Sequence, residues 1–193
     1  RVPARNEAGT IGAVVAALRT QNYQGDFRVV VVDDASTDGT AERANSASAA
    51  MPRGLVPHTL EVIAAPPLDA GWTGKLWALN AGIDHAAAPG STEYLWFTDA
   101  DVEHPPETLA QLVSKDVTDR RDLVSLMVRL RCESFWEHCL VPAFIFFFQM
   151  LYPFAAANDD RARTAAAAGG SVLIRSDALA KAGGLRAISG CVI

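Results

Sequence analysis

The stretch Tyr94–Glu107 reads Tyr-Leu-Trp-Phe-Thr-Asp-Ala-Asp-Val-Glu-His-Pro-Pro-Glu. An apolar run ends in two carboxylates, Asp99 and Asp101, and the two prolines that follow are typical of a helix start. The pattern predicts a buried strand whose carboxyl end leads into an acidic loop, at the edge where open α/β sheets bind ligands. Two such carboxylates repel each other unless a cation neutralises them, and oxygen ligands suit Mg²⁺ or Mn²⁺ shared with substrate phosphates.

Length and composition are those of one globular domain. The chain has 193 residues, of which half are hydrophobic, and a net charge of −5, which favours no nucleic-acid partner. Its cysteines, Cys132, Cys139 and Cys191, lack metal-binding spacing and indicate a reducing setting. Because the chain opens without Met and ends in an apolar run at Ile193, we expect a fragment that lacks part of its first strand and its later segments.

Alternating helix and strand patterns fill the first half. Apolar positions from Ile11 to Leu18 recur at helical spacing, and Phe27–Val32 is a continuous β-branched run typical of a strand covered on both faces. Leu60–Ala64 is a predicted strand and Lys75–Ala88 a predicted helix. Strands and helices in alternation predict an α/β fold with a doubly wound, mostly parallel sheet flanked by helices.

The second half has a different texture. Leu123–Leu130 alternates apolar and polar residues, which favours an edge or antiparallel strand. Gly169–Arg175 is a further predicted strand. Ser176 is expected to cap a short helix that Gly183-Gly184 ends.

Phe135–Ala157 is strongly apolar, and the part from Cys139 to Ala157 contains no charged residue. Pro142 and Pro153 are expected to leave only a short uninterrupted helix between them, whereas a membrane span needs about 20 apolar residues. Contact with a membrane interface is favoured, and a buried core helix and a true span stay open as alternatives.

Polar residues follow three predicted strands: Asn6-Glu7, Asp33-Asp34 and Asp99-Asp101. The carboxyl ends of parallel strands lie along one edge, so these residues are expected to converge. Taken singly, the first two pairs are also explained by helix capping and turn formation.

Two familiar sites are a poor match. A dinucleotide-binding domain needs Gly-x-Gly-x-x-Gly after its first strand, and the residues from Ala4 to Glu7 contain no glycine. A phosphatase with an aspartyl nucleophile places a small hydroxyl residue or Val two residues after its acid pair and has the pair near the chain start. Here Glu103 occupies that position, and the pair is in mid-chain.

Four ordered motifs resemble those of the family 2 glycosyltransferases: Val2–Glu7, Val29–Thr40, Gly74–Gly82 and Phe97–Asp101. Ala168–Leu185 is similar to that family's later strand–helix segment, so the resemblance covers nearly the whole chain. Gly71–Lys75 and the long Phe/Pro stretch further resemble the hopanoid-associated glycosyltransferases.

The resemblance implies a GT-A fold, a nucleotide-diphosphate sugar as donor, with a UDP-sugar favoured, and Mg²⁺ or Mn²⁺ as cofactor. It implies that Asp101 and Asp99 hold the metal, with Asp101 the more direct ligand. Asp34, with Asp33 beside it, would contact the base, and Lys75 would lie near the diphosphate. The implied substrate-binding residues are Pro3, Arg5, Asn6, Glu7, Asp33, Asp34, Lys75, Asp99 and Ala100.

The family reaction is an inverting displacement by an acceptor hydroxyl, which in hopanoid-associated relatives is of lipid type. This implies activity at the cytoplasmic face of the cell membrane. It also implies one domain with a nucleotide-sugar half at about 1–103 and an acceptor half at about 104–193. The resemblance places the catalytic base beyond Ile193, so no base is named here. A sugar-phosphate nucleotidyltransferase and a non-catalytic nucleotide-sugar binding module stay open as alternatives.

Four further residues have two readings each. His104 is either a third metal ligand or, as favoured here, a turn or surface residue. Arg129 and Arg131 either face phosphate or mark a solvated strand end. Trp72 either packs its loop or touches the donor.

Overall fold

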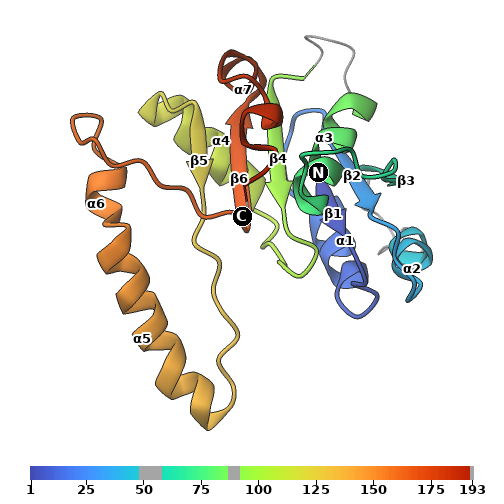
Figure 1. Cartoon of the computed structure of the whole chain (residues 1–193), viewed down its shortest axis with the longest axis horizontal. Helices are drawn as coiled ribbons and strands as arrows, with labels where there is room; N and C mark the ends of the chain where they lie inside the picture. The colour runs from blue at the N-terminus through green and yellow to red at the C-terminus, as the bar shows by residue number, and fades with distance from the viewer. Residues whose placement is uncertain (48–57, 87–91, 192–193) are drawn as a thin grey trace.

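The computed structural model describes residues 1–47, 58–86 and 92–191 (Figure 1). Its strands are β1 (Val2–Ala4), β2 (Arg28–Asp33), β3 (Thr59–Ala64), β4 (Tyr94–Thr98), β5 (Leu123–Ser125) and β6 (Ser171–Arg175). Its helices are α1 (Ile11–Arg19), α2 (Thr40–Ala47), α3 (Gly74–Ala86), α4 (Thr108–Asp119), α5 (Phe135–Leu151), α6 (Phe154–Ala157) and α7 (Ser176–Lys181), and a 3₁₀ turn covers Leu185–Ile188. Ala87 and Ala88, which end the helix expected at 75–88, lie outside the described residues.

Strand β2 is the buried centre of a parallel group ordered β1-β2-β3. Side chains along a strand point alternately to its two faces. Val29 and Val31 join the core cluster that contains α1, whereas Val30 and Val32 pack with Ala78 of α3. Both faces of β2 are therefore covered, which is why its sequence is apolar without interruption.

Strand β4 continues the sheet beside β1. The α-amino group of Arg1 donates to the Trp96 carbonyl at 2.5 Å, and the Thr98 N–H donates to the Arg1 carbonyl at 3.1 Å, which is the pattern of parallel neighbours. Beyond β4 lie β6 and then β5, each antiparallel to its neighbour. The predicted α/β fold with a mostly parallel sheet is confirmed, and among the described strands β6 is the one that runs in reverse.

The predicted edge, antiparallel strand is confirmed as β5, but its predicted length and the capping role of Ser176 are wrong. The strand expected over Leu123–Leu130 ends at Ser125, because its antiparallel partner β6 begins at Ser171. Only the Leu126 N–H, which donates to the Ser171 carbonyl at 2.9 Å, extends the pairing. Ser176 does not cap α7, since Arg175 is the N-cap residue and the Ser176 hydroxyl is buried with no hydrogen-bond partner among the described residues.

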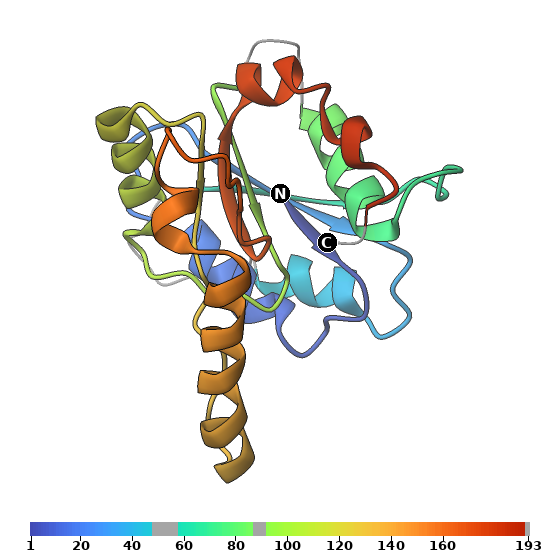
Figure 2. The same cartoon turned by 60° about the vertical axis from the view of Figure 1, so that its left-hand side comes forward.

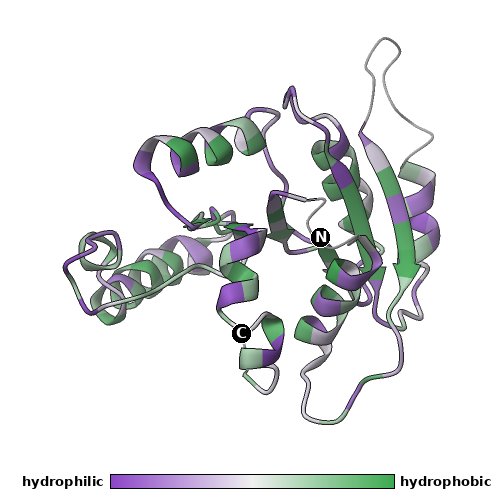
Figure 3. Cartoon of the chain, turned by 90° about the horizontal axis from the view of Figure 1, so that it is seen from above, coloured by the Kyte–Doolittle hydropathy of each residue, from purple (hydrophilic) through white to green (hydrophobic). Residues whose placement is uncertain are grey.

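Residues Leu126–Ala168, which we call the apolar arm, leave the body of the protein and return to it. Their main element, α5, projects away from the sheet (Figures 1 and 2) and is coloured mainly as hydrophobic (Figure 3). The reading as a buried core helix is wrong, because α5 has no buried residue. Within the described residues, no helix is both long and apolar enough to cross a bilayer.

Helix α5 is longer than its prolines predicted. It begins at Phe135 and runs through Pro142, so this proline lies inside the helix, where it removes one backbone N–H. A capping box fixes the start: the Ser134 hydroxyl accepts from the Glu137 N–H, and the Glu137 carboxylate accepts from the Ser134 N–H at 2.7 Å. The backbone N–H groups of Ser134 and Glu133 both donate to the Glu137 carboxylate and lower its pKa to about 2.

Candidate functional site

The polar residues after β1, β2 and β4 converge at one edge of the sheet, as predicted. β1 lies between β2 and β4, so the loops that follow these three strands are neighbours. The Asp34 N–H donates to the Ala4 carbonyl at 2.8 Å, which joins the first two loops directly. Pro3 stands opposite Val32 in β1 and is half-buried.

The loop after β1 is held by side chains of the loop after β2. Asn6 adopts a left-handed backbone with φ of 57°, a conformation that Asn tolerates better than most residues. Its side-chain oxygen accepts from the Thr37 N–H and its own N–H donates to the Ser36 hydroxyl, both at 2.9 Å. Asn6 therefore couples the two loops, and its carboxamide oxygen is already engaged.

Two more backbone groups of the first loop are bound in the same way. The Glu7 N–H donates to the Thr40 hydroxyl at 2.8 Å, and the Ala8 N–H donates to the Asp38 carboxylate at 3.0 Å. Asp38 also accepts from the hydroxyl and the N–H of Thr40, and these donors, the Thr40 hydroxyl first, lower its pKa. The sequence predicted helix capping for the loop after β2. It did not predict that this loop also binds the backbone of the loop after β1.

Asp34 and Asp33 sit differently at the end of β2. Asp34 forms an ion pair with Arg5 at 3.3 Å, and a Cβ atom added to Gly74 would lie only 3.0 Å from its carboxylate. Gly74 was not predicted as a site residue, although it allows the start of α3 to approach Asp34. One carboxylate oxygen of Asp33 accepts from the Ser36 N–H, and the other is buried with no partner among the described residues. Because this oxygen is enclosed, a ligand's N–H group could reach it only if the surrounding loop moved.

Lys75 and the acid pair form the charged part of the site. The Lys75 ammonium lies 2.7 Å from a carboxylate oxygen of Asp99, and both side chains are about one-third exposed, at 32% and 31%. The Asp99 N–H donates to the Gly170 carbonyl at 3.1 Å, which joins this loop to the start of β6. Asp101 is exposed, and no described residue forms an ion pair or hydrogen bond with its side chain.

The donor set fits a hard divalent cation that is shared with a ligand. Asp99 and Asp101 offer carboxylate oxygens, which Mg²⁺ and Mn²⁺ prefer. Among residues 1–47, 58–86 and 92–191, no group of three or more His, Cys, Asp or Glu side chains is placed to hold a metal. Two carboxylates alone leave most coordination positions open, so phosphate oxygens would have to complete them.

His104 is neither a surface residue nor a metal ligand. It is 7% exposed, its Nε2 lies 2.7 Å from the Thr98 hydroxyl, and its ring centroid lies 4.7 Å from that of Trp96. Burial lowers its pKa to about 4, so the ring is neutral at pH 7. The favoured turn or surface role is therefore wrong: His104 packs beneath the acidic loop.

The structure shows the surroundings of three other predicted residues. The Ala100 side chain is 4% exposed and belongs to the core, so a ligand could reach only its backbone. Trp72 packs against the cluster around Leu76 and lies against Trp77 with ring centroids 5.3 Å apart, which favours the packing role. Arg131 is exposed and pairs with Glu133, in agreement with a solvated segment.

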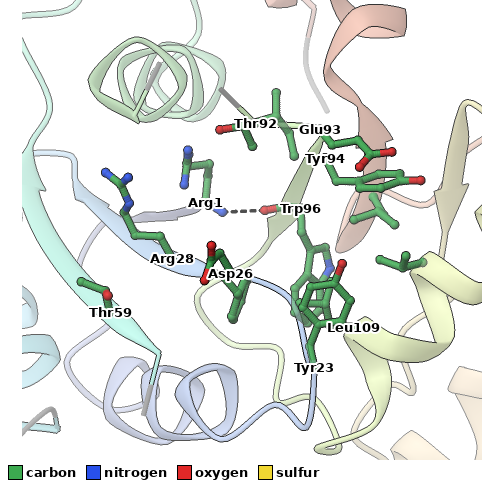
Figure 4. Close-up of a pocket in the computed structure, with 14 residues that line it drawn as sticks. Arg1, Tyr23, Asp26, Arg28, Thr59, Thr92, Glu93, Tyr94, Trp96 and Leu109 are labelled. Carbon is green, nitrogen blue, oxygen red and sulfur yellow. Dashed lines mark hydrogen bonds between the residues drawn. The ribbon is translucent and has the colours of Figure 1, made fainter. Parts of the chain in front are cut away.

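A cavity of about 580 Å³ lies elsewhere in the protein (Figure 4). It is lined by residues at the amino ends of β2 and β4, such as Arg28 and Tyr94, and by Arg1, whose α-amino group bonds the Trp96 carbonyl. The acidic loops lie at the opposite, carboxyl ends of these strands. This cavity is therefore not part of the candidate site.

The fold and the site define an α/β protein of GT-A-like architecture. Residues 2–183 match the family model described as glycosyl transferase family 2. The chain belongs to glycosyl transferase family 2. No curated protein sequence matches it.

Solved structures share this fold. The mannosyltransferase PcManGT from Pyrobaculum calidifontis, in complex with GDP-Man and Mn²⁺, is 26% identical with a TM-score of 0.65, over 95% of this chain and 45% of that one. Glucosyl-3-phosphoglycerate synthase from Mycobacterium tuberculosis, in complex with Mn²⁺, UDP and phosphoglyceric acid, is 19% identical with a TM-score of 0.60, over 92% and 55%. S. aureus TarS 1-349 with UDP-GlcNAc is 23% identical with a TM-score of 0.50, over 69% and 35%. The chain thus spans about half or less of the length of these structures.

Proposed function

We propose that this protein transfers a sugar from a nucleotide-diphosphate sugar, with a UDP-sugar favoured, to an acceptor hydroxyl by inverting displacement. The observation that carries the proposal is the meeting of Lys75 with Asp99 at the carboxyl edge of the sheet, beside the unpaired Asp101. Membership of glycosyl transferase family 2 supports the class of reaction. A sugar-phosphate nucleotidyltransferase has no such support.

The loops after β1 and β2 form the nucleoside side of the proposed site. Pro3, Arg5, Asn6 and Glu7 line it, and the hydrogen bonds from the second loop hold its backbone before any ligand arrives. Asp34, with Asp33 beside it, would contact the base, and Asp34 also positions Arg5 through their ion pair.

The diphosphate is proposed to lie between Lys75 and the acid pair. Lys75 is in the first turn of α3, where unpaired N–H groups and the helix dipole favour an anion. Asp99, Asp101 and the backbone of Ala100 border the same place. Asp101 and Asp99 would hold Mg²⁺ or Mn²⁺, and a bound cation supplies charge neutralisation for the leaving diphosphate. Mn²⁺ is present in the complexes of two of the similar structures.

The catalytic base is proposed to lie beyond Ile193, as the family resemblance implies. Asp159 and Asp160 are the alternative within the chain, but both already have partners. Asp160 forms an ion pair with Arg121, and Asp159 accepts from the Arg161 N–H at 2.9 Å. A base must be free to accept a proton from the acceptor hydroxyl.

The acceptor is proposed to be of lipid type, in a narrower version a hopanoid, at the cytoplasmic face of the cell membrane. Its support is the exposed apolar arm, which leaves the sheet next to the acid pair. In this proposal residues 1–103 form the nucleotide-sugar half and residues 104–193 the acceptor half of one domain.

Calorimetric titration of the 193-residue chain with UDP and with GDP, each with and without Mn²⁺, tests the proposal. We expect UDP to bind at least about tenfold more tightly with Mn²⁺, and Asp101→Asn to remove this difference. Glu103→Gln is the matched control, because Glu103 is an exposed acid in the same loop and should leave the difference intact. Equal affinity for UDP with and without Mn²⁺ would contradict the metal-bridged site.

A further inference from the structure

Helix α5 exposes large apolar side chains on opposite faces. At 3.6 residues per turn, positions two apart point about 200° from each other. Phe144 and Phe146 are such a pair, and they are 54% and 66% exposed. The other exposed large apolar residues of the helix are Phe135, Trp136, Leu140, Ile145, Phe147, Met150 and Leu151. The apolar surface therefore runs around most of the helix.

This distribution indicates what kind of partner covers the helix. A second copy of the chain, or a groove in another protein, would cover one side of a projecting helix and leave the opposite side in water. A helix that lies flat on a membrane keeps a charged face toward water, but the chain is free of charge from Cys139 to Ala157. A helix that is apolar all round needs an apolar medium all round.

The ends of the helix fit a bilayer as that medium. Trp136, 69% exposed, and Tyr152, 43% exposed, flank the run, and such side chains favour the headgroup region. Arg161 and Arg163 follow on the return segment, are exposed, and have no acidic partner among the described residues. Their charge suits anionic lipid headgroups.

We propose that the uncharged part of α5, from Cys139 to Leu151, inserts its whole circumference into the acyl region of a membrane without crossing the bilayer. The first turn, with the carboxylate of Glu137, stays at the headgroups beside Trp136. The 17 residues of α5 would span about 26 Å, less than the roughly 30 Å hydrocarbon core. It is thus a membrane-embedded anchor rather than an interfacial helix with one wet face.

The attachment of the arm to the sheet connects this anchor with the site where the acceptor would bind. One end of the arm is bound by the Leu126 N–H to the Ser171 carbonyl, and the adjacent Gly170 carbonyl accepts from the Asp99 N–H. Insertion of the arm therefore holds the acid pair near the membrane surface. This second step rests on the proposed function: the acceptor is an amphiphile whose hydroxyl-bearing headgroup lies at that surface.

Depth-dependent fluorescence quenching tests the insertion. Cys132, Cys139 and Cys191 are replaced by Ser, and an environment-sensitive dye is placed at Phe144→Cys or at Phe146→Cys. Vesicles of phosphatidylcholine with a minor fraction of phosphatidylglycerol carry a nitroxide on the acyl chain. We expect similar quenching at both positions. Quenching at one position only would show a helix with one wet face, and quenching at neither would show that another protein chain covers it; both results overturn the proposal.

Vesicle flotation with matched variants supplies a second measurement. Phe146→Glu/Phe147→Glu should lower vesicle binding more than about tenfold, because charges are costly in the acyl region. Leu68→Glu/Val117→Glu changes two exposed apolar residues outside the arm and should float like the parent. Loss of flotation in this control, or retention in the arm variant, would overturn the proposal. UDP binding with Mn²⁺ is measured on the same samples, so a failed nucleotide site is distinguished from a failed anchor.

Discussion

The Lys75 ammonium lies 2.7 Å from the Asp99 carboxylate, although the two residues belong to different elements of the chain. Lys75 begins helix α3, and Asp99 follows strand β4. In the absence of ligand the ammonium supplies the positive charge that Asp99 needs. A diphosphate would compete with Asp99 for Lys75, and a divalent cation would compete with Lys75 for Asp99.

We therefore expect Lys75→Met to have opposite effects on the two ligands. Without nucleotide, Mn²⁺ should bind more tightly, because Asp99 has lost its competing counter-charge. With Mn²⁺ present, UDP should bind about tenfold more weakly, because the diphosphate has lost a charged donor. Titration calorimetry measures both effects. Lys115→Met is the control, since Lys115 pairs with Asp119 on the exposed face of α4. Unchanged UDP affinity in Lys75→Met would exclude Lys75 from the diphosphate site.

Gly74→Ala should weaken nucleoside binding without unfolding the protein. The added methyl group would lie 3.0 Å from the Asp34 carboxylate, which must shift by a few tenths of an ångström and so disturb its ion pair with Arg5. We expect uridine affinity to fall several-fold, while the free energy of unfolding changes by less than about 1 kcal/mol. Calorimetry and denaturant unfolding measure the two quantities. Gly12→Ala is the control, because a methyl group there meets no atom within 4 Å; equal uridine affinity in both variants would contradict the prediction.

Asn6→Ala should destabilise the protein by about 1–3 kcal/mol, since it removes the acceptor for the Thr37 N–H and places Ala in a left-handed conformation. Asn6→Gly loses the same acceptor but tolerates a φ of 57°. We expect Asn6→Gly to be the more stable of the two variants in denaturant unfolding. The reverse order would show that φ at this position does not limit stability.

His104 should make stability depend on pH in the acidic range. Its pKa is about 4 in the folded protein and 6.5 ordinarily, so between these pH values the unfolded chain binds the extra proton. Stability contributed by neutral His104 is fully present above pH 6.5 and declines as the pH falls toward 4, by at most about 3 kcal/mol. Denaturant unfolding across this range measures the decline. It should be smaller in His104→Gln and remain in His138→Gln, whose histidine is exposed on α5; an identical decline in all three proteins would assign it to other groups.

Local periodicity and turn residues predicted most of the fold. The β-branched run at Phe27–Val32 could only be a strand covered on both faces, and the abrupt change from Phe97 to Asp99 marked a strand end. The sequence by itself thus determined the element order, the edge where the acids gather and the candidate residues there. These features depend on neighbours within a few positions, where side-chain period and backbone geometry dominate.

Tertiary structure decided what each candidate touches. The length of β5 depended on where β6 begins, and the burial of His104 depended on Trp96 and on the sheet beneath it. The exposure of α5 followed from the absence of any covering element among the described residues, which an apolar sequence does not reveal. Asn6 meets Thr37, and Lys75 meets Asp99, because β1 lies between β2 and β4. Strand order is set by packing between distant segments, and no local pattern along the chain encodes it.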